Sequence, residues 1–97
     1  MRIIKRKTLK TYWVQHSGTE QALEAWYNEV KHAEWNNTSD IKKRYPSASF
    51  LKDNRVVFNI KGNDLRLIVV VKYTIKTVYI RFIDTHAEYD KIDAKEI

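Results

Sequence analysis

The sequence predicts an α+β fold in which N-terminal helices pack on one face of a small antiparallel sheet. Up to Pro46, apolar residues recur at spacings of three and four, as they do along one side of a helix. After Pro46 apolar and polar residues alternate, as they do along a strand. Ninety-seven residues have room for one core only, so a single domain over residues 1–97 is expected.

The N-terminal part of the chain is expected to hold a strand and two helices. Residues 1–5 form the strand, and residues 7–15 form a short helix. Ser17-Gly18-Thr19-Glu20 has the form of a capping box and opens a longer amphipathic helix. Its apolar positions recur at helical spacing, and they are Leu23, Trp26, Val30 and Ala33.

A third helix and three strands are expected to follow. Ser39 would cap a helix over residues 39–45, which Pro46 stops because the residue before a proline avoids helical geometry. Val56, Phe58 and Ile60 then alternate with polar or smaller residues. A turn at 62–64 leads into a strand from residue 65 to about 73, and after a reversal at 74–76 the last strand covers residues 77–83.

Alternation along these strands predicts two different faces. Val78, Ile80 and Phe82 share the face that packs on the helices, and Tyr79 and Arg81 face solvent. If the polar positions of neighbouring strands align, one exposed face carries cations and an aromatic ring. Its members are Asn59, Arg66, Lys72, Tyr79 and Arg81.

The composition favours an anionic partner and excludes thiol chemistry. The chain has 18 Lys and Arg against 12 Asp and Glu, a net charge of +6 and a pI near 9.6, so nucleic acid is the leading candidate. There is no cysteine. The basic N-terminus lacks the apolar stretch of a signal peptide, and the longest apolar run is far shorter than the roughly 20 residues that span a bilayer. A cytoplasmic protein with no membrane partner is therefore expected.

The segment Thr85-His86-Ala87-Glu88-Tyr89-Asp90 has two interpretations. Thr85 and Glu88 form a capping box, so the segment starts a C-terminal helix. In that helix His86, Tyr89 and Asp90 share one face, as the groups of an active site would. The pattern alone does not choose between a helix start and a site.

Other charged residues have equally plain alternatives. Arg66 and Arg81 lie inside strands, where they either form a solvated face or bind phosphate through their guanidinium groups. The N-terminal cations that include Lys5 and Arg6 either keep the chain soluble or hold a polyanion backbone. His16, His32 and His86 make no convincing metal set, and there is no phosphate-binding glycine loop.

Together these segments resemble the HigB toxins, a branch of the RelE-like superfamily of bacterial toxin–antitoxin systems. The resemblance covers essentially the whole chain in order. The segments that carry it are Ala25-Trp26-Tyr27, Ala33-Glu34-Trp35, Asp40-Ile41-Lys42, Tyr45-Pro46-Ser47-Ala48, Val57-Phe58-Asn59-Ile60, Gly62-Asn63, Arg66-Leu67-Ile68, Tyr79-Ile80-Arg81-Phe82 and Thr85-His86-Ala87-Glu88-Tyr89-Asp90.

The resemblance implies an mRNA endoribonuclease that enters the ribosomal A site on the 30S subunit and cuts message during translation. It implies a cognate HigA-like antitoxin with a helix-turn-helix domain, and operator DNA bound through the toxin–antitoxin complex. It also implies metal-independent chemistry without a cofactor, in which the ribose 2′-OH attacks the adjacent phosphorus.

Carried over residue by residue, the resemblance places Arg66 near the scissile phosphate and His86 where relatives have a basic or imidazole group. Tyr89 lies close to the position of a C-terminal tyrosine, at a different spacing from the strand. Where relatives have lysines before the turn, this chain has Asn59, with Lys61 two residues on. That departure leaves the identity of the general base open.

These implications give a set of expected roles. Arg66 and Arg81 stabilise the phosphate, His86 acts as general acid or base, Tyr89 stacks or donates a proton, and Asp90 orients His86. The expected RNA contacts are Lys5, Arg6, Asn59, Lys61, Asn63, Lys72 and Tyr79. The competing interpretation is a non-catalytic RNA- or ribosome-binding module of the same fold, and a structural role in a larger complex is a third. Codon preference and the stoichiometry of the antitoxin complex are left open.

Overall fold

A computed structural model describes residues 1–97 as four helices and five strands. In chain order the elements are β1 (Arg2–Ile4), α1 (Arg6–Gln15), α2 (Glu20–Lys31), α3 (Thr38–Arg44), β2 (Ser49–Leu51), β3 (Arg55–Ile60), β4 (Leu65–Lys72), β5 (Thr77–Thr85) and α4 (His86–Tyr89). No helix is long and apolar enough to cross a membrane.

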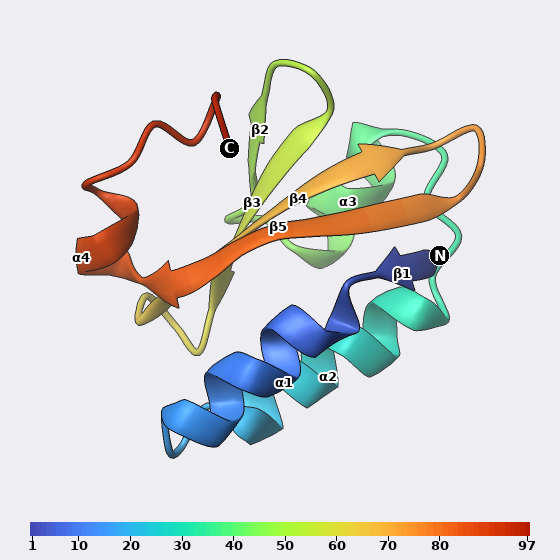
Figure 1. Cartoon of the computed structure of the whole chain (residues 1–97). Coiled ribbons are helices and arrows are strands. Elements are labelled where there is room, and N and C mark those ends of the chain that lie inside the picture. Colours follow the sequence, from blue (N-terminus) through green and yellow to red (C-terminus); the bar gives the residue numbers. More distant parts are fainter.

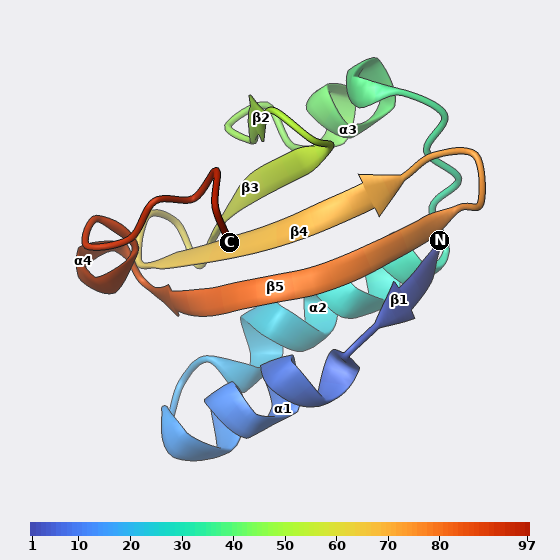
Figure 2. The ribbon, with the colours of Figure 1, turned by 45° about the horizontal axis from the view of Figure 1, so that its top comes forward.

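The strands form one sheet in the order β1-β5-β4-β3-β2. Helices α1 and α2 lie side by side against one face of the sheet, here called the first face, and α4 and the C-terminal segment lie on the second face (Figures 1 and 2). The predicted α+β fold is confirmed, and β3, β4 and β5 are antiparallel as expected. The first strand differs, because β1 joins the edge of β5 in parallel.

Two of the predicted helix starts are wrong in detail. Thr19, not Ser17, is the N-cap of α2, and its hydroxyl donates backward to the His16 carbonyl at 2.7 Å. No side chain therefore caps this helix. Asn37, not Ser39, caps α3 by accepting the Asp40 N–H at 3.1 Å. Asn and Ser are about equally good caps, so residue type alone could not choose between them.

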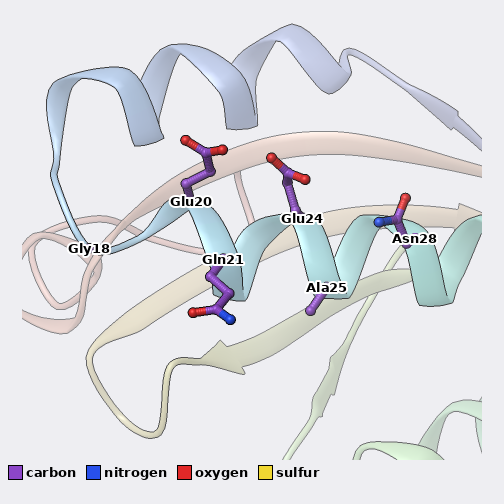
Figure 3. Close-up of a pocket in the computed structure, with 6 residues that line it drawn as sticks. All are labelled: Gly18, Glu20, Gln21, Glu24, Ala25 and Asn28. Atoms are coloured by element: carbon purple, nitrogen blue, oxygen red, sulfur yellow. The ribbon is translucent and has the colours of Figure 1, made fainter.

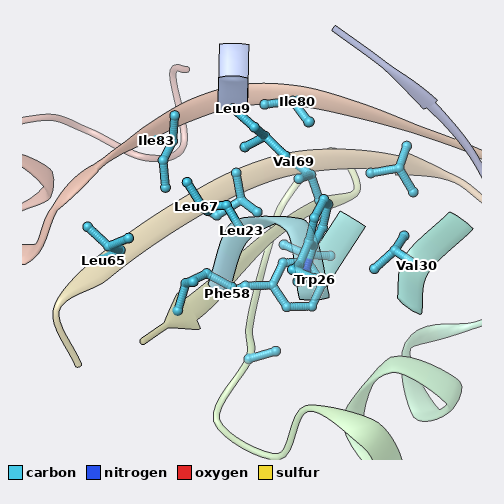
Figure 4. Close-up of a cluster of buried hydrophobic side chains, with 14 of the residues drawn as sticks. Leu9, Leu23, Trp26, Val30, Phe58, Leu65, Leu67, Val69, Ile80 and Ile83 are labelled. Carbon is cyan, nitrogen blue, oxygen red and sulfur yellow. The ribbon is translucent and has the colours of Figure 1, made fainter. Parts of the chain in front are cut away.

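The main core fills the space between the helices and the first face of the sheet (Figure 4). It contains 20 buried residues, and Phe58 lies in the middle of its aromatic part. The Phe58 ring lies 5.4 Å from Trp26, 6.0 Å from Trp35 and 5.0 Å from Tyr45, measured between ring centroids. The predicted alternation of β3 is confirmed, since Val56, Phe58 and Ile60 all belong to this core.

The short strand β2 was not predicted from the sequence. Its residues pair with the first part of β3, so that Ser49 lies opposite Val57 and Leu51 opposite Arg55. Strand β2 has only three residues, which is too short for an alternating pattern to be recognised in the sequence. Beyond Val57, the outer edge of β3 has no strand beside it.

A one-residue irregularity in β5 changes which side chains reach the core. Ile68 lies opposite Phe82, but the next residue, Val69, lies opposite Ile80, so Arg81 is the extra residue of a β-bulge. Phe82 therefore lies on the second face, and Ile83 takes its place in the main core. The prediction that Phe82 packs on the helices is wrong, because strict alternation ends at the bulge.

The second face is less exposed than the sequence suggested. Its centre is apolar, with Val57, Ile68 and Phe82 in neighbouring strands. The chain after β5 covers this centre through residues that pack on it, namely Tyr89, Ile92, Ala94 and Ile97. The expected cationic residues share this face, but they do not form one continuous exposed surface.

Candidate active site

The second face is organised as three rows of residues that run across β3, β4 and β5. The rows contain Arg55, Val70 and Tyr79, then Val57, Ile68 and Phe82, then Asn59, Arg66 and Asp84. They are called here the Arg55 row, the apolar row and the polar row. Arg81 projects from the bulge between the first two. Polar chemistry is thereby divided between the two ends of the face.

The side chain of Arg66 is fixed over the turn between β3 and β4. Its Nη1 donates to the carbonyls of Asn63 at 3.0 Å and Leu65 at 3.2 Å. A guanidinium has five N–H donors, and those on Nε and Nη2 make no hydrogen bond within the protein. A positioned, half-buried arginine with free donors is suited to hold a phosphate.

The start of α4 is attached to the same turn. The Thr85 hydroxyl accepts the Glu88 N–H at 3.2 Å, which confirms Thr85 as the N-cap. The predicted capping box is only half formed, because the Thr85 N–H donates to Asp84 and not to Glu88. The His86 N–H donates to the Asp64 carbonyl at 3.0 Å. Arg66 and His86 are thus anchored to the carbonyls of two consecutive residues, Asn63 and Asp64. The turn brings together two residues that are 20 positions apart in the sequence.

His86 and Asp90 face each other one helical turn apart. His86 Nδ1 lies 3.4 Å from Asp90 Oδ1, and the two side chains are 52% and 59% exposed. This is the pairing that the sequence spacing predicted. Tyr89 lies differently, because its half-buried ring packs toward the apolar row.

Arg81 faces the other end of the second face. Its Nε donates to the Ile97 main-chain oxygen at 3.1 Å, and Arg55 Nη2 donates to the same oxygen at 3.1 Å. The apolar row lies between Arg81 and Arg66. The structure therefore does not place the two predicted phosphate ligands side by side.

The remaining predicted RNA contacts are spread over the molecule. Lys61 and Asn63 belong to the turn beside Arg66, and Asn59 belongs to the polar row, where its Nδ2 donates to the Ser47 carbonyl at 3.2 Å. Lys72 and Tyr79 lie toward the opposite ends of their strands, which at about 3.3 Å per residue puts Lys72 roughly 20 Å from Arg66.

Lys5 and Arg6 lie at the start of α1, in the helix layer on the first face. The guanidinium of Arg6 stands 4.8 Å from the Tyr27 ring and 5.6 Å from the Trp13 ring, measured to the centroids. Arg6 thus makes a cation–π contact between α1 and α2. The structure does not bring these two residues to the polar row.

Asp84 and Arg55 were not singled out from the sequence. Asp84 lies one residue beyond the predicted strand 77–83, and the bulge in β5 puts it opposite Arg66. The Asp84 carboxylate accepts the Thr85 N–H at 2.8 Å. It also lies beside Tyr12 of α1, where burial and the Asp84 charge raise the pKa of Tyr12. Neither position has a sequence signal without knowledge of the strand register.

The largest hollow of the surface lies elsewhere and has the wrong charge for RNA. It measures about 560 Å³ along α2 and is lined by Glu20 and Glu24 (Figure 3). A hydrogen bond with the Glu24 carboxyl, with further contributions from burial and charge, raises the pKa of Glu20. Two neighbouring carboxyl groups repel phosphate, so this hollow is no candidate for RNA binding.

Comparisons with known proteins identify the family to which the chain is similar. Residues 19–92 match the family model for HigB toxin, described as the RelE-like toxic component of a toxin–antitoxin system. The mRNA interferase toxin HigB of Escherichia coli K12 is 32% identical over 92 residues, which cover 93% of this chain and 88% of the relative. The mRNA interferase HigB of Escherichia coli O6:H1 strain CFT073 is 24% identical over 94 residues, covering 95% and 91%. This chain therefore belongs to the HigB family of RelE-like toxins.

Proposed function

We propose that this toxin is an endoribonuclease that cuts mRNA in the A site of the translating ribosome. The observation that carries the proposal is the anchoring of Arg66 and His86 to one turn, through the Asn63 and Asp64 carbonyls. This supplies a phosphate ligand and a proton-transfer group at the same end of the sheet. The relatives whose matches cover more than 90% of this chain are named mRNA interferases, and this supports the same chemistry.

The reaction needs a base, an acid and a cation. The ribose 2′-OH attacks the adjacent phosphorus, the P–O bond to the 5′-oxygen breaks, and a 2′,3′-cyclic phosphate and a 5′-hydroxyl result. The free donors of Arg66 stabilise the negative charge that builds up on the phosphorane oxygens. No metal ion takes part in this scheme, and no cofactor is required.

His86 is the proton-transfer group. Its Nδ1 faces Asp90 Oδ1 at 3.4 Å, so Asp90 orients the ring and favours the proton on Nδ1. Nε2 then points away from Asp90, where it takes the 2′ proton or, when protonated, gives one to the leaving oxygen. Tyr89 contributes a ring against which a base stacks, or a phenolic proton.

Other basic residues bind RNA further from the cut. Asn59 in the polar row, with Lys61 and Asn63 in the turn beside it, contacts the nucleotides next to the scissile bond. Arg81, Lys72 and Tyr79 bind a stretch of backbone along the second face. Lys5 and Arg6 lie in the helix layer and contact ribosomal RNA of the 30S subunit. Backbone contacts of this kind are independent of sequence.

The partners follow from family membership. A toxin of this family has an antitoxin, and we propose that the antitoxin is HigA-like, carries a helix-turn-helix domain and represses its own operator together with the toxin. The toxin acts in the cytoplasm, where ribosomes translate.

The test maps new 5′ ends by primer extension after incubating purified toxin and one mRNA, with and without translating ribosomes. We expect cuts only when ribosomes are present. His86→Ala should lower the cleavage rate by roughly 10²–10⁴-fold. The matched control is His32→Ala, which removes an imidazole that bonds the Asn28 carbonyl at the end of α2. Equal cleavage by His86→Ala and wild type would remove His86 from the mechanism.

A non-catalytic module that occupies RNA or the ribosome is the alternative. One observation favours it: only one arginine faces the polar row, since Arg81 is directed to Ile97. The two functions differ in what Arg66→Ala does. Loss of cleavage with retained ribosome binding, measured by co-sedimentation, supports the nuclease. Undiminished growth arrest without any cleavage supports the binding module.

A further inference from the structure

A small groove lies beside the outer edge of β3, next to the polar row, and the proposed proton transfers do not use it. It has a volume of about 210 Å³ and is enclosed by α2, the end of α3 and the outer edge of β3. Its polar lining comes from Trp26, Glu29, Arg44, Tyr45, Asn59 and Lys61. Two of these side chains have buried polar atoms without a hydrogen-bond partner.

The first of these atoms is the indole nitrogen of Trp26. Trp26 is only 3% exposed, its ring packs on Phe58, and its Nε1 makes no hydrogen bond within the protein (Figure 4). An indole N–H is a donor only, and buried donors in folded proteins nearly always have an acceptor. The groove therefore lacks a hydrogen-bond acceptor at this point.

The second atom is a carboxylate oxygen of Glu29. Its Oε2 accepts from Arg44 Nη2 at 2.5 Å, and its Oε1 is buried without a partner. The Tyr45 phenol hydrogen-bonds to this carboxylate, and an ionised carboxylate has about four lone-pair sites, so acceptor capacity remains on it. Oε1 is an acceptor, so the groove offers a donor site and an acceptor site on the same wall.

The main chain of Asn59 adds a second donor and acceptor. Val71 N–H donates to the Asn54 carbonyl, which makes Arg55 and Val70 a pair without direct hydrogen bonds. By the alternation of antiparallel pairing, Asn59 also turns its N–H and C=O away from β4. Strand β2 ends its pairing at Val57, so these two groups face the groove.

Asn59 also connects the groove with the polar row. Its side chain lies on the second face opposite Arg66, and its main chain faces the open edge of β3. Neighbouring strands are about 4.8 Å apart, so a strand of RNA with its phosphate at Arg66 has its next base within reach of the groove. Two cations stand at the rim, Arg44 and Lys61.

The size of the groove limits what it holds. A volume of 210 Å³ is below the range of about 300–1,000 Å³ that suits drug-sized ligands, and it is enough for one flat heterocycle. A peptide added to the strand edge would need several free main-chain groups, and only those of Asn59 are available. A single ring with polar edges matches the polar atoms of the lining, and a phosphate attached to it matches the cations Arg44 and Lys61.

We propose that this groove binds one base of the RNA, adjacent to the nucleotide that is cut, and thereby contributes to the choice of cleavage site. Trp26 N–H donates to a ring nitrogen or carbonyl oxygen of the base, and Glu29 Oε1 accepts one of its N–H groups. The inference rests on the proposed function for the identity of RNA as the substrate.

The first experiment measures binding without cleavage. The chain has three tryptophans and thus three indole N–H signals in a ¹H–¹⁵N correlation spectrum, and Trp26→Phe identifies the one from the groove. Each of the four ribonucleoside 5′-monophosphates is titrated to roughly 10 mM, a range that detects millimolar affinity. We expect the Trp26 signal to shift with at least one of them and not with inorganic phosphate. A Trp26 signal that moves with no nucleotide, or equally with phosphate, overturns the proposal.

The second experiment reads base preference. Glu29→Gln keeps the size of the side chain and replaces a carboxylate with an amide, and Glu24→Gln on the outer side of α2 is the matched control. We expect Glu29→Gln to change the relative use of cleavage sites by on the order of ten-fold, as loss of a base contact does. Glu24→Gln should cut at the wild-type sites. An unchanged pattern with Glu29→Gln overturns the inference. Absence of cuts by the wild type instead refutes the proposed function, and the titration then decides on the groove separately.

Discussion

The two faces of the sheet are built from the same strands and differ in what their side chains do. The first face belongs to a core of 20 buried residues under α1 and α2. The second face has a cluster with only three buried residues, and charged rows lie on both sides of it. In a chain of this size, one well-covered face supplies the stability. The other face is thereby free to carry charged groups that burial would penalise.

The largest effect is expected on the first face. Phe58 is completely buried and touches three aromatic rings. Phe58→Ala should lower the free energy of unfolding by about 3–5 kcal/mol, through lost burial and the cavity left behind. Urea unfolding followed by tryptophan fluorescence measures this change. A decrease of less than about 1 kcal/mol in the free energy of unfolding would contradict the view that the first face supplies the stability.

Replacing Arg66 on the second face should lower activity and leave stability nearly unchanged. Arg66→Ala removes the free guanidinium donors and should lower the cleavage rate by roughly 10²–10³-fold, as loss of a charge-stabilising donor does. The urea midpoint should move little, because Arg66 is only half-buried. Lys43→Ala, an exposed cation on α3, controls for net charge. Equal cleavage by the Arg66 and Lys43 variants would exclude a phosphate-binding role for Arg66.

Sequence periodicity predicted the first face up to the bulge in β5 and was insufficient for the second face. Burial on one side imposes a period, so Leu23, Trp26 and Val30, or Val56, Phe58 and Ile60, are visible in the sequence itself. The position of Asp84 depends on a bulge that no periodicity signals. The groove at Trp26 depends on the ending of β2, a strand too short to predict. His86 and Asp90 were predictable because their pairing is local to one helical turn.

Two helix caps of similar geometry offer a smaller and sharper test. The Thr85 Oγ1 accepts a main-chain N–H at 3.2 Å, and the Asn37 Oδ1 accepts one at 3.1 Å. Thr85→Ala and Asn37→Ala should each cost about 1 kcal/mol of stability. Only Thr85→Ala should also slow cleavage, because the cap it removes positions His86. Thermal unfolding and the primer-extension assay give the two readouts. Equal loss of cleavage in both variants would show that activity follows stability alone.

The smallest expected effect is a pH dependence on the first face. Burial, together with the Glu29 carboxylate, raises the pKa of Tyr45 above its ordinary value of about 10. The folded state thus keeps the phenol protonated where the unfolded state has begun to ionise. This contribution to stability is complete below about pH 10 and is lost as the pH rises further. Urea midpoints of the wild type should fall between pH 9 and pH 11, and those of Tyr45→Phe should fall less. A parallel decline of both proteins would refute this assignment.

The extra residue in β5 fixes the phase of everything that follows it in the chain. Before Arg81 the even-numbered residues Val78 and Ile80 point into the core. After Arg81 the odd-numbered residue Ile83 does so instead. Deleting Arg81 would join Ile80 directly to Phe82 and give an unbulged strand in which Phe82 and Asp84 stay on the second face and Ile83 stays in the core. Unbroken alternation through Arg81 would instead turn Ile83 out of the core. The bulge at Arg81 therefore determines which face carries each side chain that follows it, whatever the identity of Arg81 itself.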